Sequence, residues 1–481
     1  MTSEHNSRGA WWVLGLSLGL GVLGNLLVPG PWGINIGVWV LLLAGSALWI
    51  SKRTHAIRGS IWFIVAVLLA FALAWRDSPA LNAINVGAAL TALAFGAAAR
   101  GHGLRSGFLG SLWAVWAAFT SWIGGWLGLL VADLPWRDLI RDADSKRWAG
   151  LVRGLAITLP LLLVFGGLLT SADAAFGRLV SSLFVWQFDG QVLTRTTLIF
   201  LWFTFACGVL RLSIKGAQPL RALTLPKLGL LEISMALGAL NLLFTAFIVV
   251  QFGYFFGGNV NVTALTGLTY AEYARRGSSE VIQVVALTLP VLIAALHLSE
   301  ATLKAALTVR VLSSITLGLL CVMLISAWQR LELYRVAYGL TEIRLYTAVF
   351  IIWLGAMLVW FAATALRERY ALFPTGAIIA VFSVVLTLNA LNPSAMIVTA
   401  NVARAIDDPR YDFDRDYALE LGADGVNALL DNLGRIPSMS PNWIVDTTEL
   451  ARVTNLEYGD WRGFNLAKAQ AIRSLETRPK P

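Results

Sequence analysis

Long apolar runs, broken by short polar segments, fill the chain up to residue 393. A membrane-spanning helix needs about 20 such residues, and with this ruler the pattern predicts twelve spans. Proline and glycine mark several of the breaks, as at residues 29–31 and 392–393. The expected spans are residues 10–28, 34–50, 59–75, 80–99, 107–131, 149–170, 192–213, 229–255, 280–298, 311–328, 343–366 and 374–391. We therefore predict an all-α, polytopic transmembrane helix bundle.

The chain after Pro393 is amphipathic instead of uniformly apolar. Apolar residues at helical spacing between Asp424 and Gly434 predict one short helix, and a second is expected from Asp460 to about Leu475. The residues expected on the apolar faces are Val426, Leu429, Leu430 and Leu433 in the first helix, and Trp461, Phe464, Ala467, Ala471 and Leu475 in the second. Helices this short make a marginal core, so we expect the tail to dock on the membrane part or on a partner.

These patterns divide the chain into three regions. Residues 1–148 are expected to form an N-terminal membrane region of about five spans, residues 149–393 a second membrane region of about seven spans, and residues 394–481 a soluble helical C-terminal tail. The tail holds 10 of the 37 basic and 13 of the 28 acidic residues, which leaves a net charge of +12 on residues 1–393. Basic loops orient spans and contact lipid headgroups, so this charge gives no reason to expect nucleic-acid binding.

Composition excludes a water-soluble globule. Only 14% of the residues are charged and 57% are hydrophobic, against roughly 25% charged residues in an ordinary soluble protein. The chain also holds 43 glycines and 20 tryptophans, which suits closely packed helices with indole rings at the bilayer interfaces. The lipid bilayer is the expected partner, and a protein partner is expected through residues 394–481 if the tail does not dock on the bundle.

The distribution of basic residues gives conflicting orientations. In the second half, basic residues at 137–147 and 211–227 place both loops in the cytoplasm and the tail outside. In the first half, the basic residues at 52–58 and 100–105 lie in loops that this orientation would place on the opposite side of the membrane. Either one early segment does not span the membrane, or the bias in the first half is too weak to decide.

Motifs of catalysis or metal binding do not fit their surroundings. Asp412, Asp414 and Asp416 alternate as in a calcium loop, but Tyr417 stands where such a loop needs glycine, so a turn or a helix start is the preferred interpretation. Cys207 and Cys321 both lie within apolar runs and predict no disulfide or thiolate site. We expect no catalytic, cofactor-binding or metal-binding residues and no cofactor.

Glu232 is the candidate intramembrane acid, because an ionisable group within a span is costly and usually tied to function or pairing. It lies close to the start of the span at residues 229–255. The alternative is therefore an interfacial acid or a charge at the helix start.

Three stretches are distinctive: "YFFGGNVNVTALTGLTYAEYARRGSSE" (254–280), "YGLTEIRLYTAVFIIWLG" (338–355) and "LNPSAMIVTANVAR" (391–404). With "TSADAAF" (170–176) and "DWRGFNLAKA" in the tail, they resemble the bacterial membrane family known as domain of unknown function 4173, related to the 4153 group. The resemblance covers about residues 150–475. It implies a multi-pass inner-membrane protein of unassigned activity and supplies no catalytic residues.

The number of spans between successive loops predicts a polar cluster on one side of the membrane. The loops after the sixth, eighth and tenth spans and the tail after the twelfth are separated by two spans each, which places all four on the same side. They bring together Asp173, Tyr270, Glu272, Tyr273, Arg275, Glu342, Arg344, Asn401 and Arg404. We expect Glu272 or Glu342 to pair with an arginine of another segment, under cover of the tail.

The number of spans and their scattered polar residues favour a non-enzymatic binding or transport protein of the permease type. A membrane signalling or regulatory component that acts through its C-terminal tail is the alternative. A lipid-linked transferase is the second alternative. Nothing in the sequence identifies a small-molecule ligand.

Overall fold

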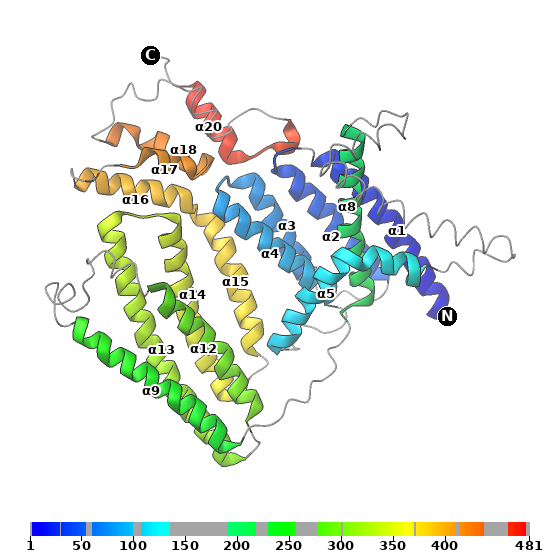
Figure 1. Cartoon of the computed structure of the whole chain (residues 1–481). Coiled ribbons are helices and arrows are strands. Elements are labelled where there is room, and N and C mark those ends of the chain that lie inside the picture. Colours follow the sequence, from blue (N-terminus) through cyan, green and yellow to red (C-terminus); the bar gives the residue numbers. More distant parts are fainter. Residues whose placement is uncertain are drawn as a thin grey trace, which may run out of the picture. The chain divides into compact units, whose positions relative to one another are not determined.

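The protein is described here from a computed structural model that covers residues 2–28, 30–53, 60–99, 107–134, 190–217, 229–255, 278–299, 302–369, 372–408, 411, 413–436 and 460–477. The elements within these ranges are helices, without a β-strand among them (Figure 1). Ten of these helices are long and apolar enough to cross a membrane. The all-α, polytopic fold predicted from the sequence is thus confirmed, and the chain divides into two compact units.

Unit 1 comprises residues 1–75, 82–220 and 458–466. Within it α1 packs against α2 and α8, α2 packs against α3, and α5 packs against α8. The close crossing of α5 and α8 is fixed by Ser121, whose Oγ donates a hydrogen bond to the carbonyl oxygen of Gly208 at 3.0 Å. Its elements are α1 (Thr2–Leu27), α2 (Ile34–Arg53), α3 (Ser60–Trp75), α4 (Pro79–Ala98, from Asn82), α5 (Gly107–Gly128), the π-helical turn η2 (Leu129–Asp133), α8 (Gly190–Lys215) and the 3₁₀ turn η6 (Trp461–Gly463).

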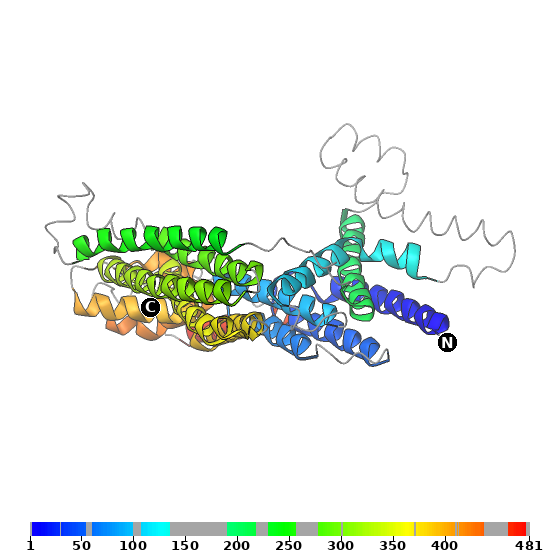
Figure 2. The same ribbon diagram turned by 90° about the horizontal axis from the view of Figure 1, so that it is seen from below.

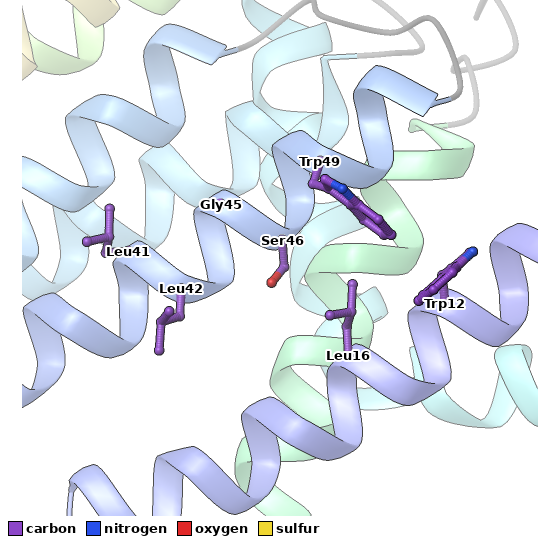
Figure 3. A pocket seen from close by; sticks show the side chains of 7 residues that line it. All are labelled: Trp12, Leu16, Leu41, Leu42, Gly45, Ser46 and Trp49. Carbon is purple, nitrogen blue, oxygen red and sulfur yellow. The ribbon is translucent and has the colours of Figure 1, made fainter.

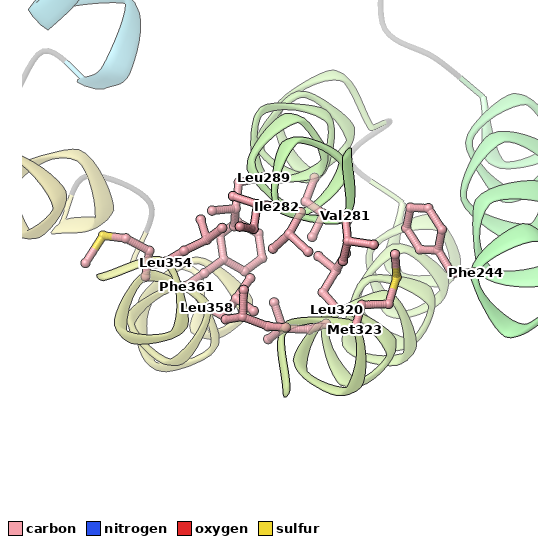
Figure 4. Packing of buried hydrophobic residues seen from close by; sticks show 14 of the residues in the cluster. Phe244, Val281, Ile282, Leu289, Leu320, Met323, Leu354, Leu358 and Phe361 are labelled. Atoms are coloured by element: carbon pink, nitrogen blue, oxygen red, sulfur yellow. The ribbon is translucent and has the colours of Figure 1, made fainter. Parts of the chain in front are cut away.

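Unit 2 comprises residues 76–81, 221–457 and 467–481. Its longest helix, α13, packs against α9, α12 and α14, and α14 packs against α15 (Figure 2). Leu320 of α13 and Leu354, Leu358 and Phe361 of α14 meet α12 in a core of buried aliphatic and aromatic side chains (Figure 4). The membrane-type helices of this unit are α9 (Leu230–Phe255), α12 (Ser278–Leu298), α13 (Leu303–Tyr338), α14 (Glu342–Thr364) with the short η3 (Ala365–Arg367), and α15 (Leu372–Leu391).

Each expected span that falls on described residues coincides with a helix, whereas the span expected at residues 149–170 lies outside them. The largest difference in length is at α13, which has 36 residues instead of the expected 18, whereas α3 has 16 residues, close to the expected 17. At about 1.5 Å per residue α13 is roughly 54 Å long, so it projects well beyond a hydrocarbon layer of about 30 Å. Its polar last ten residues continue the helix because the tail caps them, as described below.

An asparagine within the bundle joins two spans. Asn241 of α9 donates from Nδ2 to the Leu312 carbonyl of α13 at 3.1 Å, and its Oδ1 accepts from the Thr316 hydroxyl at 2.7 Å. All the polar atoms in this contact are satisfied between helices, which is the use of asparagine expected in a membrane bundle.

The C-terminal tail forms a small core of its own within unit 2. Ile397 and Val402 of α16 pack with Leu419, Val426 and Leu429 of α17 and α18, and α16 lies across the ends of α13 and α14 (Figure 1). The helix predicted between Asp424 and Gly434 is confirmed as α18. The elements are α16 (Pro393–Asp407), α17 (Arg415–Glu420), α18 (Ala423–Asn432), η4 (Leu433–Arg435) and α20 (Leu466–Glu476).

The second tail helix was predicted wrongly at its start. The helix α20 begins at Leu466, and the preceding residues form the η6 turn, whose N-cap Asp460 accepts a hydrogen bond from the Arg462 amide. Ala467 and Ala471 are buried as expected, whereas Trp461 and Phe464 are exposed. Trp461 lies in the η6 turn, and Asn465, a poor helix former, stands between Phe464 and the start of α20.

Candidate functional site

The polar site of unit 2 lies where the tail covers the connection between α13 and α14. Asn401 of α16 binds the backbone of Leu340 in this connection with both atoms of its side-chain amide. Its Oδ1 accepts from the Leu340 N–H at 2.8 Å, and its Nδ2 donates to the Leu340 carbonyl, also at 2.8 Å. Satisfying both groups of one residue in this way fixes the tail in register with the end of the bundle.

Two arginines bind the C-terminal carbonyls of α13. Arg404 of α16 donates to the carbonyls of Arg335 and Ala337 at 3.2 and 3.0 Å. Arg344, in the first turn of α14, donates to the Tyr338 carbonyl at 3.0 Å. Because the last carbonyls of a helix lack partners within it and carry its negative dipole end, both cations stabilise this terminus. This is the physical reason that α13 continues so far beyond its apolar part.

Each of these arginines also stacks on a tyrosine. The guanidinium carbon of Arg344 lies 4.2 Å from the ring centroid of Tyr334, and that of Arg404 lies 4.3 Å from the ring centroid of Tyr411. Cation–π contacts of this kind hold the guanidinium planes in place. The two arginines are therefore committed to the helix end and its aromatic neighbours.

Glu342, the first residue of α14, lies among hydroxyl groups. Its backbone N–H donates to the Tyr417 hydroxyl of α17 at 2.8 Å, and its carboxylate lies 3.5 Å from the hydroxyl of Ser78. Among the described residues, no lysine or arginine nitrogen lies within 4.0 Å of this carboxylate. Burial raises the pKa of Tyr417 above its ordinary value, so this phenol keeps its proton and remains able to donate it.

An ion pair buried beside this group joins residues 348 apart. Arg76 Nη1 lies 3.3 Å from Asp424 Oδ1, with only 13% and 4% of the two side chains exposed. Asp424 also accepts from the Asp77 amide and from Asn392 Nδ2, each at 2.8 Å. Burial raises the pKa of Asp424 above its ordinary value, and the amide of Asp77, the charge of Arg76 and the Asn392 amide partly oppose that rise.

Asp77, the residue after Arg76, also contacts the tail. Its carboxylate accepts from the Ala423 amide at 3.0 Å and lies 3.8 Å from Lys468 Nζ. Gly422, with φ of +80°, passes so close that a Cβ atom built on it would lie 2.1 Å from the Asp77 carbonyl oxygen. Only glycine combines this left-handed backbone with this approach. The segment 76–81 is thereby fixed against α18.

The residues predicted for the polar cluster are placed as follows. Glu342, Arg344, Asn401 and Arg404 all lie around the α13–α14 connection. Glu342 contacts Ser78 and Arg344 binds backbone, so the expected pairing of Glu342 with an arginine is not seen among the described residues; the buried pair is Arg76–Asp424 instead. The remaining members lie outside the described residues: Asp173, Tyr270, Glu272, Tyr273 and Arg275.

Two other acidic residues singled out in the sequence cap the N-termini of helices. Glu232 is exposed in the first turn of α9, where its carboxylate accepts from the Gly229 amide at 2.8 Å. This is the geometry of a helix-start cap. Asp414 is the N-cap of α17 and accepts from the Tyr417 amide, in agreement with the helix-start interpretation of the alternating aspartates. Groups of three or more metal-ligating side chains are absent from the described ranges.

Unit 1 carries a groove of a different character, between α1 and α2 (Figure 3). Its volume is about 550 Å³, and it is lined by Trp12, Leu16, Leu41, Leu42, Gly45, Ser46 and Trp49. No charged side chain lines it, so the groove suits an apolar chain and offers no group for acid–base chemistry.

Comparison with known proteins identifies the family to which the chain belongs. Residues 63–432 match the model described as Domain of unknown function (DUF4153), while no curated protein and no solved structure matches the chain. The match begins within α3, earlier than the resemblance near residue 150 suggested, and the 4173 label is not confirmed. It contains the 76–81 segment, α13–α18 and hence the whole Glu342 and Asp424 site except Lys468. Since the match covers most of its residues, the chain belongs to the DUF4153 family.

Proposed function

We propose that this multi-pass membrane protein is a permease-like protein of the bacterial inner membrane, which binds a polar solute and moves it without catalysing a reaction. The observation that carries the proposal is the environment of Glu342. Its carboxylate is half-buried at the end of three packed spans, faces the Ser78 hydroxyl and has no cationic partner among the described residues. The bacterial inner membrane is inferred from the resemblance of the motifs.

A sheltered carboxylate without a counter-charge attracts groups that can compensate it. Removing a charged group from water costs several kcal/mol unless a partner is found. The groups that match a carboxylate beside a single hydroxyl are a proton, a cation or a solute with amine or hydroxyl donors. Helices α14 and α15 carry no charged residue between Leu345 and Leu366 or between Leu372 and Leu391. Arg344, in the same turn as Glu342, is bound to the Tyr338 carbonyl, so Glu342 is the charged group best placed at this end to bind a solute.

The tail supplies a cover for this site. Asn401 and Arg404 attach α16 to the end of α13, and Tyr417 of α17 reaches the first amide of α14. Leu340 and Leu345 also pack against the tail core. Local opening of such a cover leaves the spans beneath it folded. This supports a role for residues 394–481 in controlling access to Glu342.

A second candidate function is a regulatory component whose tail recruits a protein partner. The observation that favours it is the tail's own hydrophobic core, formed by α16, α17, α18 and α20. A domain with its own core can present a surface to another protein. If this function holds, pull-down partners of the full chain will be lost on disruption of the tail, while solutes will have no effect on the bundle.

Thermal unfolding of the purified full chain in detergent tests the permease proposal. We expect at least one compound in a panel of amino acids, amines, sugars and monovalent cations to raise the melting temperature of the wild-type protein. The Glu342→Gln variant should lose that response. Glu332→Gln is the matched control, because Glu332 lies at the same end of the bundle but is paired with Arg335.

Two results would overturn the proposal. One is a flat response of the wild-type protein across the whole panel. The other is an undiminished response of Glu342→Gln. Mass spectrometry of the recovered compound separates binding from catalysis, since a transferase of lipid-linked groups would return an altered product.

A further inference from the structure

Three large aromatic side chains are exposed at the α1–α2 connection of unit 1. Trp461 and Phe464 belong to the "DWRGF" segment of the tail, with 66% and 46% of their surface exposed, and Trp32 in the connection itself is 56% exposed. Leaving three such rings in water would be costly, at roughly 25 cal/mol per Å² of apolar surface. Their exposure therefore points to a surface that is covered in the working protein.

The segment that carries Trp461 and Phe464 is fixed to the ends of three helices. The Phe464 carbonyl accepts from the Ile34 amide at 3.0 Å at the start of α2, and Asn465 Nδ2 donates to the Leu73 carbonyl in the last turn of α3 at 2.8 Å. Arg462 donates to the Leu26 carbonyl in the last turn of α1. At Gly33 a Cβ atom would lie 2.4 Å from the Phe464 carbonyl oxygen, so the two backbones are in direct contact.

This attachment point lies at one end of two helices that have the length and composition of membrane spans. Both α1 and α2 contain candidate membrane spans, and their exposed faces between the two ends are aliphatic, with Leu18, Val22 and Leu41 among the exposed residues. A tryptophan pair, Trp12 and Trp49, closes the opposite end, with ring centroids 5.1 Å apart (Figure 3).

The separation of the two aromatic groups matches a membrane. The 15 residues from Trp12 to Leu27 rise about 23 Å along α1, and the connection to Trp32 brings the distance close to the hydrocarbon thickness of about 30 Å. Tryptophan and other aromatic residues gather at the two edges of the hydrocarbon layer. Trp32, Trp461 and Phe464 form one of these two edges.

We infer that the "DWRGF" segment is an interfacial membrane anchor, in which Trp461 and Phe464 insert into the lipid headgroup region beside α1 and α2. The occupant of this surface is the bilayer and not a protein, because the exposed rings continue the lipid-facing aliphatic surface of the same two spans. Arg462 is paired with Asp460 and with the Leu26 carbonyl. The anchor therefore depends on apolar insertion, not on anionic lipid.

Position-specific fluorescence of the full chain in lipid nanodiscs tests this anchor. In a variant with Cys207 and Cys321 replaced by serine, Trp461→Cys is labelled with an environment-sensitive dye, and nitroxide-bearing phosphatidylcholine serves as the quencher. We expect quenching by the lipid nitroxide at least threefold stronger than for the same dye at Glu476→Cys, an exposed position on α20. Adding anionic phosphatidylglycerol should leave the value unchanged.

Phe464→Cys is the second reporter, so that failure of one variant to fold does not decide the result. Iodide, a water-soluble quencher, supplies the opposite readout. If iodide quenches the dye at 461 and 464 as strongly as at 476, and lipid nitroxide does not discriminate between them, the segment lies in water and the inference is overturned. If lipid quenching appears only with anionic lipid, the anchor is electrostatic and the apolar mechanism is overturned.

Discussion

Arg76 and Asp424 form a buried ion pair across 348 residues of sequence, with Nη1 and Oδ1 3.3 Å apart. Arg76 lies at the start of the 76–81 segment, and Asp424 lies in the first turn of α18. Arg76 also donates from Nε to the Asn389 carbonyl near the end of α15 at 2.7 Å. One arginine thus connects a loop, a span and the tail.

Removing the arginine should destabilise unit 2 strongly. Arg76→Met leaves the Asp424 carboxylate buried with amide partners only, and breaking a buried pair from one side costs about 3–5 kcal/mol. We expect a lower melting temperature of the full chain in detergent. Asp424→Asn should cost less, because the amide keeps an acceptor for the Asp77 N–H, and the Arg76 guanidinium that loses its counter-charge still donates to the Asn389 carbonyl. Equal losses in the two variants would contradict this interpretation of the pair.

The pH dependence of stability should report Asp424. Its folded pKa is raised, chiefly by burial, so the folded protein holds this proton over a pH range in which the unfolded chain has lost it. Stability therefore falls as pH rises from the ordinary aspartate pKa, about 3.9, through the raised folded pKa. Asp424→Asn should remove this slope, as measured by melting temperature between pH 4 and pH 7. A slope that survives in the variant would assign it to another group.

Asn401 should contribute through both of its hydrogen bonds. Asn401→Ala leaves an N–H and a C=O of Leu340 without their partners, and each such group costs about 1–3 kcal/mol. Hydrogen exchange at Leu340 should accelerate together with a loss of thermal stability. Thr399→Ala is the control, because Thr399 lies exposed on the same helix, and it should change neither quantity.

Gly422 should tolerate no side chain. In Gly422→Ala the methyl group would lie 2.1 Å from the Asp77 carbonyl oxygen at a φ of +80°, so either the tail or the 76–81 segment must move. We expect a loss of at least about 2 kcal/mol from strain and broken contacts. Gly434→Ala is the comparison, since a Cβ there meets open space, and near-wild-type stability of Gly422→Ala would refute the close contact.

The length of the apolar runs predicted the spans well, because every helix that crosses the hydrocarbon layer needs a long apolar run. It underestimated α13, since the residues after Trp328 are held in the helix by Arg344 and Arg404 and not by lipid. The site was predicted only in part. Glu342, Arg344, Asn401 and Arg404 lie in segments with distinctive motifs, whereas the pairing of Arg76 with Asp424 leaves no periodic signal over its long separation.

The tail shows the other limit of pattern reasoning. Helical spacing placed Trp461 and Phe464 on the same face as Ala467 and Ala471, but a 3₁₀ turn and Asn465 intervene. The i, i+3, i+4 pattern does not register such an interruption. What distinguishes the two aromatic residues is their contact with the α1–α2 connection, which only the fold reveals.

The shelter of Glu342 by the tail is tested most directly by thiol labelling. In the full chain with Cys207 and Cys321 replaced by serine, Glu342→Cys should react with a membrane-impermeant maleimide at least tenfold more slowly than Glu332→Cys, a partly exposed position at the same end of the bundle whose side chain is 42% exposed. Adding Asn401→Ala and Arg404→Ala should release the tail and raise the rate at position 342 towards that at 332. Equal rates at the two positions in the intact chain, or a rate at 342 that ignores the loss of both tail contacts, would contradict the account.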